Sequence, residues 1–184
     1  MSALVFLAPG FEDIEGITVI DILRRAEIET VVAGLVSNPI TAARQTRHVA
    51  DMQLADVDPE RKFEVVVLPG GVEGAKHLGE SPRVREWLFR QRKRDQWVAA
   101  VCAAPTALLA HGWLKPEQKL ISHPSVQGQF PAGQIQTGKR VVVDGKLITG
   151  LGAGAAMEWS FEIVRQLRGV VVAEKVNQGV LAVV

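Results

Sequence analysis

The chain has 184 residues, of which 47% are hydrophobic and 22% are charged, a composition typical of a globular protein and not of a disordered one. Its 21 lysine and arginine residues balance 20 aspartate and glutamate residues, which leaves a formal charge of +1. This balance argues against a nucleic acid or an anionic membrane as the main partner, and we expect no dedicated nucleic-acid site.

Short apolar runs alternate with segments of helical spacing in the first half of the chain. Strands are predicted at residues 3–8, 30–35 and 63–68, with a helix over 14–26 between the first two. Residues 38–58 are polar and irregular, with one strand expected near residues 49–54. The third strand ends at a Pro-Gly-Gly turn, which is a strong break signal.

The second half continues the alternation. Its predicted elements are helices over 81–94, 104–111 and 155–167, a strand over 97–101, an extended segment over 119–122, and hairpin strands over 140–143 and 146–149. The apolar tail from Val170 fits either a helix or a strand. Buried strands that alternate with helices indicate an α/β fold with a mostly parallel sheet covered on both faces. The chain has no flexible linker and no repeat, so we predict a single domain over residues 1–184.

The cysteine, tyrosine and histidine content of the chain excludes several types of catalytic and metal site. Cys102 is the only cysteine, which excludes an intrachain disulfide, a cysteine-based zinc site and a two-cysteine redox relay. No tyrosine is present, so no step can use a phenol. The four histidines lie too far apart for two of them to share a helical turn, and we expect no metal site. They are His48, His77, His111 and His123.

The sequence shows no targeting or membrane segment. The apolar residues 3–8 lack a preceding basic residue and are followed at once by acidic residues, a poor pattern for a signal peptide. The longest nearly apolar run, residues 97–110, contains a proline and is too short to span a bilayer. We therefore expect a cytoplasmic protein without a membrane partner.

Reactive side chains follow several of the predicted strands. In a parallel α/β sheet, ligands bind at the carboxyl ends of the strands. Glu15 follows the first strand, Gly70 and Gly71 the third, Cys102 the strand over 97–101, and His123 the extended segment. A thiol, a carboxyl group, an imidazole and a glycine turn are therefore expected at one edge of the sheet.

Cys102 is the centre of this predicted site. A buried strand turns sharply into a helix at Cys102, and small residues surround it, as in a nucleophile elbow. A helix N-terminus lowers the pKa of a thiol, and the thiolate is the reactive form. The alternative is a small buried core residue, because free cysteine is among the most buried residue types.

Three backbone N–H groups are candidates to bind a developing oxyanion, those of Gly70, Gly71 and Ala103. Taken alone, the Pro-Gly-Gly segment is better explained as the end of a strand. The glycines at 150, 152 and 154 are similar to a dinucleotide fingerprint, but too little chain follows them for a nucleotide-binding unit. We interpret them as a tight turn that lines the cleft.

Glu15 and His123 are the candidate acid–base groups. Glu15 can simply be an acidic residue at a helix N-terminus. If it reaches Cys102, one proton should be shared between the two groups, and a protonated Glu15 could relay it to substrate. His123 is either a base or a structural residue. A basic run along the helix over 81–94 is interpreted as a solvated helix face.

Three segments carry a resemblance to a known family. Residues 8–15, 66–71 and 101–109 closely resemble the ThiJ/PfpI superfamily, in the branch of the parkinsonism-associated protein deglycase and its bacterial YajL-like relatives. The similarity runs over nearly the whole chain in the same order. It implies a flavodoxin-like three-layer sandwich, a homodimer and no cofactor.

The resemblance also implies roles for individual residues. Cys102 is expected to be an oxidation-prone nucleophile that is hydrogen-bonded to a protonated Glu15, with His123 nearby. The oxyanion position is expected at Gly70, Gly71 and Ala103. Asp21 and Arg44 are expected to bridge the dimer near the site. The protease branch has a histidine directly after the cysteine, where this chain has alanine. Peptidase activity is therefore not expected.

The activities implied by the resemblance leave several functions open. The first is a glutathione-independent glyoxalase or deglycase (a hydro-lyase or hydrolase) acting on methylglyoxal, glyoxal or their early adducts on proteins and nucleotides. The second is an oxidative-stress sensor or redox-regulated chaperone that works through oxidation of Cys102. A nucleotide-dependent oxidoreductase that uses the late glycines is the weakest of the three.

Overall fold

A central seven-stranded sheet organises the computed structural model, which describes residues 1–184. The strand order is β5-β2-β1-β6-β7-β9-β8, and every neighbouring pair is parallel except β8 with β9. Its strands are β1 (Ser2–Leu7), β2 (Glu29–Gly34), β5 (Met52–Gln53), β6 (Val65–Leu68), β7 (Trp97–Val101), β8 (Val141–Asp144) and β9 (Leu147–Gly150). A separate antiparallel pair joins β3 (Ile40–Thr41) to β4 (Arg47–His48).

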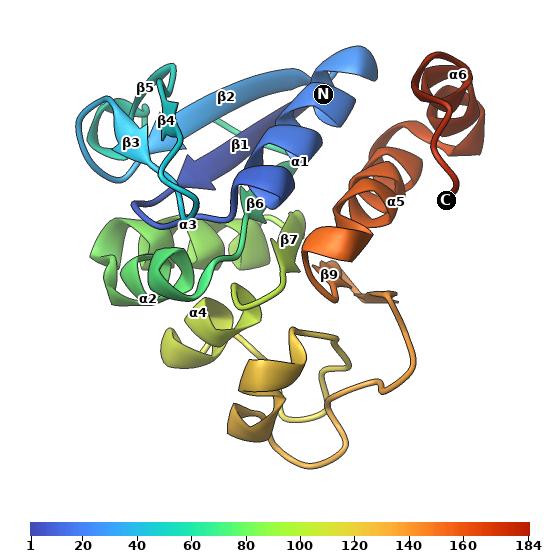
Figure 1. Ribbon diagram of the computed structural model, residues 1–184. Coiled ribbons are helices and arrows are strands. Elements are labelled where there is room, and N and C mark those ends of the chain that lie inside the picture. Colours follow the sequence, from blue (N-terminus) through green and yellow to red (C-terminus); the bar gives the residue numbers. More distant parts are fainter.

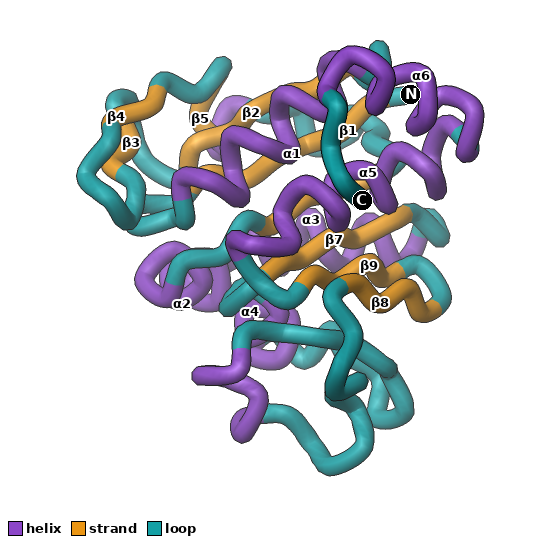
Figure 2. The backbone as a smooth tube through the Cα atoms, turned by 45° about the vertical axis from the view of Figure 1, so that its right-hand side comes forward, coloured by secondary structure: helices purple, strands orange, loops and turns teal.

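Helices cover both faces of this sheet (Figures 1 and 2). One layer contains α1 (Asp13–Arg25), α5 (Ala156–Arg168) and α6 (Val170–Val180), and the other contains α2 (Val72–Glu80), α3 (Pro82–Lys93) and α4 (Pro105–Ala110). Three short 3-10 helices complete the chain: η1 (Leu54–Asp56), η2 (Pro124–Gln129) and η3 (Ala153–Ala155). None of the helices is long and apolar enough to cross a membrane.

Side-chain alternation along the strands builds two apolar cores. In β1, Leu4 and Phe6 pack on the layer of α2, α3 and α4, whereas Val5 and Leu7 pack on the layer of α1 and α5. All four side chains are at most 1% exposed. Strands buried on both faces are the mark of a parallel sheet inside a three-layer α/β sandwich. The predicted flavodoxin-like fold class is confirmed.

Several predicted elements differ from the observed ones. Helix α2 was not predicted, because its nine residues include two glycines and follow a strong turn signal. Residues 119–122 do not join the main sheet and form one isolated bridge, from Leu120 to Ile135. The strand expected near 49–54 is only the two residues of β5. The tail from Val170, which fitted either a helix or a strand, forms helix α6.

Candidate active site

Cys102 sits on a strained turn between β7 and α4. Its backbone φ is 63°, a left-handed conformation that non-glycine residues rarely adopt. The Cys102 N–H donates to the carbonyl of Gly150, at 2.9 Å, and thereby ties the turn to the neighbouring strand β9. Pro105 then begins α4 at a position where the missing N–H costs nothing. The structure has the strand–turn–helix geometry expected of a nucleophile elbow.

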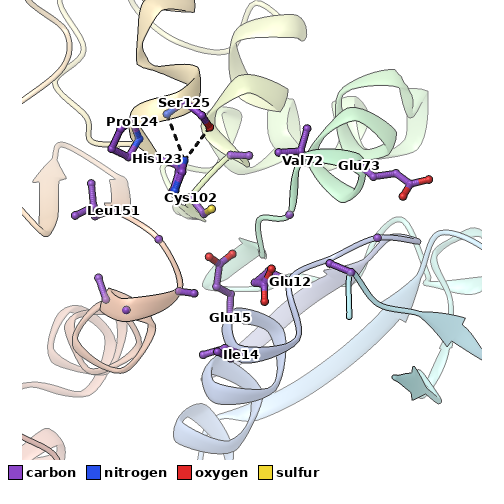
Figure 3. A pocket seen from close by; sticks show the side chains of 18 of the residues that line it. Glu12, Ile14, Glu15, Val72, Glu73, Cys102, His123, Pro124, Ser125 and Leu151 are labelled. Atoms are coloured by element: carbon purple, nitrogen blue, oxygen red, sulfur yellow. Dashed lines mark hydrogen bonds between the residues drawn. The ribbon is translucent and has the colours of Figure 1, made fainter. Parts of the chain in front are cut away.

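Glu15 lies in the first turn of α1 and its carboxyl group faces Cys102 (Figure 3). The residue is fully buried. Its Oε2 accepts a hydrogen bond of 2.8 Å from the N–H of Gly70, and its Oε1 is buried without a partner of standard geometry. A Cβ on Gly70 would stand 2.5 Å from Oε2 and 2.6 Å from the Cβ of Cys102. The close approach of carboxyl and thiol therefore requires glycine at position 70.

Burial sets the proton affinity of this pair. Desolvation raises the pKa of Glu15 from 4.5 to about 7, although the thiol and the Gly70 N–H oppose the shift. Desolvation, reinforced by the charge of Glu15, raises the pKa of the Cys102 thiol from 9.0 to about 12. The predicted lowering of the thiol pKa is therefore wrong, because burial and a neighbouring carboxylate outweigh the nearby N–H groups. A thiolate near neutral pH requires that its proton pass to Glu15.

Two backbone N–H groups point at the sulfur of Cys102, those of Gly71 and Ala103, and both favour its thiolate form. When the sulfur attacks a carbonyl carbon, these two N–H groups can donate hydrogen bonds to the carbonyl oxygen as it becomes negatively charged. The N–H of Gly70 is already bonded to Glu15. The expected oxyanion role of Gly70 is thus corrected: Gly70 holds the carboxyl group, and Gly71 and Ala103 remain at the reacting atom.

Backbone hydrogen bonds of the loop after α4 bring His123 to the cysteine. The His123 N–H donates to the carbonyl of Cys102 at 2.8 Å, and the Ile121 N–H donates to Thr149 Oγ1 at 2.9 Å. The loop thus approaches the sheet edge without contributing a strand. His123 Cδ2 and Cys102 Sγ both lie within 4 Å of the place where a Cβ on Gly152 would stand. The imidazole and the thiol therefore face the same space (Figure 3).

These groups open into a cleft of about 760 Å³. Loops after β1, β6, β7 and β9 contribute to it, as expected for the carboxyl edge of a parallel sheet. The turn over residues 152–154 lines the cleft as expected. The third of the interpreted glycines, Gly150, does not line it, because this residue is the buried end of strand β9. The lining residues beyond those already described are Gly10, Glu12, Ile14, Ala43, Arg44, Val72, Glu73, Pro124, Ser125, Arg140, Leu151, Ala153, Gly154 and Ala155.

The two expected dimer residues lie apart. Arg44 lines the cleft with an exposed side chain and approaches Glu12 at 3.6 Å. Asp21 is not among the cleft residues and pairs with Arg25 at 2.7 Å on the surface of α1. Arg140 is a cleft residue that the sequence did not indicate. It reaches the cleft because it bonds Glu158 at 2.7 Å, a long-range contact that no motif marks.

No group of three or more metal-ligating side chains is found in the chain. A three-layer α/β sandwich with a strained cysteine elbow and a buried glutamate against the thiol defines a class of cysteine-centred α/β proteins. The model of the DJ-1/PfpI family matches residues 1–166. The chain belongs to the DJ-1/PfpI family, and the resemblance noted from the sequence is confirmed.

Two relatives and one solved structure match this chain over more than nine-tenths of their own length. The Parkinson disease protein 7 homolog of Danio rerio is 40% identical over 178 residues, which are 95% of this chain and 94% of the relative. The glutathione-independent glyoxalase DJR-1.2 of Caenorhabditis elegans is 35% identical over 96% of this chain and 92% of its own length. The crystal structure of Drosophila melanogaster DJ-1beta superposes with a TM-score of 0.95, at 40% identity over 100% of this chain and 98% of the other.

Proposed function

We propose that the protein is a cysteine-dependent glyoxalase that needs no glutathione. Its substrates would be methylglyoxal, glyoxal or their early adducts on proteins and nucleotides, and its products the hydroxy acids lactate or glycolate. The observation that carries the proposal is the contact between the buried Glu15 and Cys102 at the floor of an open cleft. A relative at 35% identity that is named a glutathione-independent glyoxalase supports it.

The first step forms a carbon–sulfur bond. The Cys102 proton moves to Glu15, and the thiolate sulfur attacks the aldehyde carbon of methylglyoxal. The carbonyl electron pair moves to oxygen, which then takes the proton held by Glu15. The N–H groups of Gly71 and Ala103 stabilise the negative charge while it develops. The product of this step is a hemithioacetal, and Glu15 is left as a carboxylate.

The second step moves a proton between two carbons without any outside oxidant. The Glu15 carboxylate removes the hydrogen from the carbon bonded to sulfur, and the electron pair forms an enediolate with the neighbouring carbonyl. Glu15 then returns this proton to the second carbon, while the proton of the first hydroxyl group passes to the enediolate oxygen. The product is a lactoyl thioester on Cys102, and Glu15 is again a carboxylate. A carboxyl group with a pKa of about 7 can both accept and return this proton near neutral pH.

Hydrolysis completes the cycle. Water adds to the thioester carbon, the carbon–sulfur bond breaks, and the sulfur leaves as the thiol or thiolate that began the reaction. The overall change is methylglyoxal plus water to lactate, so no glutathione or redox partner is consumed. Solvent reaches this bond because the cleft is open at the surface.

The test is lactate formation from methylglyoxal by purified protein, with no glutathione and no metal added. We expect turnover that disappears in Cys102→Ser, whose hydroxyl is a far weaker nucleophile than a thiolate. Lactate formation by the Ser variant at the wild-type rate would refute Cys102 as the nucleophile, and no turnover by the wild type would refute the enzyme.

A second candidate function is redox sensing. Cys102 is the single thiol of the chain, so a disulfide within the chain cannot divert its oxidation. Glu15 in its protonated form and the N–H groups of Gly71 and Ala103 surround the sulfur with donors. The same donors would hold the oxygen atoms of a sulfinate. A chaperone role and a homodimer with Asp21 and Arg44 near the site remain predictions.

A further inference from the structure

The imidazole of His123 is anchored through only one of its two nitrogens. Nδ1 lies 2.8 Å from the hydroxyl oxygen of Ser125 and 3.3 Å from the backbone nitrogen of the same residue (Figure 3). The ring thereby caps the start of η2. Pro124, which separates the two residues, has a fixed φ and makes this cap rigid. Nε2 has no bond to the protein.

The Ser125 contacts decide which nitrogen carries the proton of a neutral ring. A backbone N–H can only donate, so its contact of 3.3 Å favours a bare Nδ1 that accepts from Ser125. The Ser125 hydroxyl can donate or accept, and next to a bare Nδ1 it donates. The hydrogen of the neutral imidazole then resides on Nε2.

The ring orientation aims that hydrogen into the cleft. Cδ2, which is bonded to Nε2, approaches Gly152 on the side where Cys102 lies, whereas Nδ1 turns away toward Ser125. The other ionisable side chains that line this cleft are those of Glu12, Glu15, Arg44, Glu73, Cys102 and Arg140. None of them is hydrogen-bonded to a nitrogen of the ring, so Ser125 alone fixes the tautomer.

We infer that Ser125 is a positioning residue that holds His123 as a neutral hydrogen-bond donor, with its hydrogen on Nε2, for the oxygen atoms of the substrate. The inference rests on the proposed function for the identity of that substrate. In this arrangement His123 is not a general base, since its cleft-facing nitrogen has no free lone pair. It polarises the carbonyl of the bound aldehyde or enediol, while Glu15 moves the protons. Neutral imidazole has the chemistry for such an electrophilic role.

The first test reads the tautomer directly, without substrate. Nitrogen-15 NMR of the imidazole is recorded at about pH 9, well above the ordinary histidine pKa of about 6.5, and His123 is assigned by its loss in His123→Gln. We expect a hydrogen on Nε2 and a bare Nδ1. Ser125→Asp replaces the hydroxyl at 2.8 Å from Nδ1 with an acceptor-only carboxylate, which should outweigh the longer backbone contact of 3.3 Å and move the hydrogen to Nδ1. Ser125→Asn has the same shape, can donate, and should keep the wild-type tautomer.

The second test links the tautomer to turnover. Ser125→Asp should lower kcat for methylglyoxal by about 100-fold, the effect of losing one donor to a developing oxyanion. Ser125→Thr and Ser125→Asn, which preserve a donor, should stay within about threefold of wild type. KM should change less than kcat, because the donor acts most strongly on the charge that forms during the reaction.

The outcomes separate this inference from the proposed function. A hydrogen on Nδ1 of wild-type His123 overturns the inference, whatever the activity. Equal turnover in the Asp and Asn variants, with the tautomer reversed only in Asp, also overturns it. If the wild type has no glyoxalase activity, the proposed function fails, and the NMR comparison of the Asp and Asn variants alone decides the role of Ser125.

Discussion

Replacing Glu15 with glutamine should make the protein more stable at neutral and mildly alkaline pH. Burial raises the pKa of Glu15 from 4.5 in the ordinary state to about 7 in the fold. An unfolded chain therefore gives up this proton between pH 4.5 and 7, whereas the folded protein still holds it. Stability falls with rising pH wherever the folded state binds more protons. The contribution of Glu15 to stability is thus intact below about pH 4.5 and lost as the pH rises through 7.

The size of the effect follows from the shift. The pKa of Glu15 rises by about 2.5, and each pKa unit corresponds to 1.36 kcal/mol, so the ionised form is destabilised by about 3 kcal/mol in the fold. Glutamine avoids this penalty because it is uncharged at every pH, and its carbonyl can still accept from the Gly70 N–H. The pH dependence of stability is set by the number of protons that the Glu15–Cys102 pair holds in the folded and unfolded states. The value of about 3 kcal/mol is therefore the same whether Glu15 or Cys102 gives up the proton.

The assay is urea unfolding of wild type and Glu15→Gln, followed by tryptophan fluorescence at several pH values. We expect the variant to exceed the wild type by about 3 kcal/mol at pH 8 and the difference to vanish near pH 4. Glu80→Gln, a change at the exposed end of α2, is the control and should show no such trend. A difference in unfolding free energy that is constant with pH, or largest in acid, would refute the account of Glu15 as a buried carboxyl group with a raised pKa.

Two further predictions concern the glycine turn and the thiol. Gly71→Ala should lower the free energy of unfolding by about 3 kcal/mol or more, measured in urea, because φ is +86° and the new Cβ would lie 2.3 Å from the carbonyl oxygen of Gly10. Gly179→Ala should instead raise it by about 0.5–1 kcal/mol, because Gly179 lies in helix α6 and no atom stands within 4 Å of the new Cβ. Equal effects of the two substitutions would contradict the geometry. Mild peroxide followed by intact mass analysis should add two oxygen atoms to the wild type and none to Cys102→Ser. An unmodified wild-type thiol would count against the redox role.

The sequence predicted the edge at which the site forms because that prediction needed only local patterns. Apolar runs bounded by Gly and Pro located β1, β6 and β7, and the rule for parallel sheets placed Glu15 and Cys102 at one edge. Small residues around Cys102 indicated the sharp turn that the positive φ now shows. These features are determined by a few neighbouring residues, so contacts between distant segments do not alter them.

The features that escaped prediction all arise from contacts between distant segments. The raised thiol pKa depends on burial and on a carboxyl group 87 positions earlier in the chain. Arg140 enters the cleft through its bond to Glu158. His123 was expected at this edge, but it is held there by the Cys102 carbonyl and not by a strand of the main sheet. The helix α2 was missed because its glycines have low helical propensity, which packing of Ala75 and Leu78 overrides.

The most direct test of the central claim measures two reactions of the same variant. Glu15→Gln keeps the Cys102 thiol in place but can neither receive nor return a proton. We predict that this variant remains folded and is still alkylated at Cys102 by iodoacetamide at alkaline pH, where hydroxide can remove the thiol proton without Glu15. Its conversion of methylglyoxal to lactate should fall by about 100-fold or more. Turnover at the wild-type rate with glutamine at position 15 would contradict the claim that Glu15 carries the proton for Cys102.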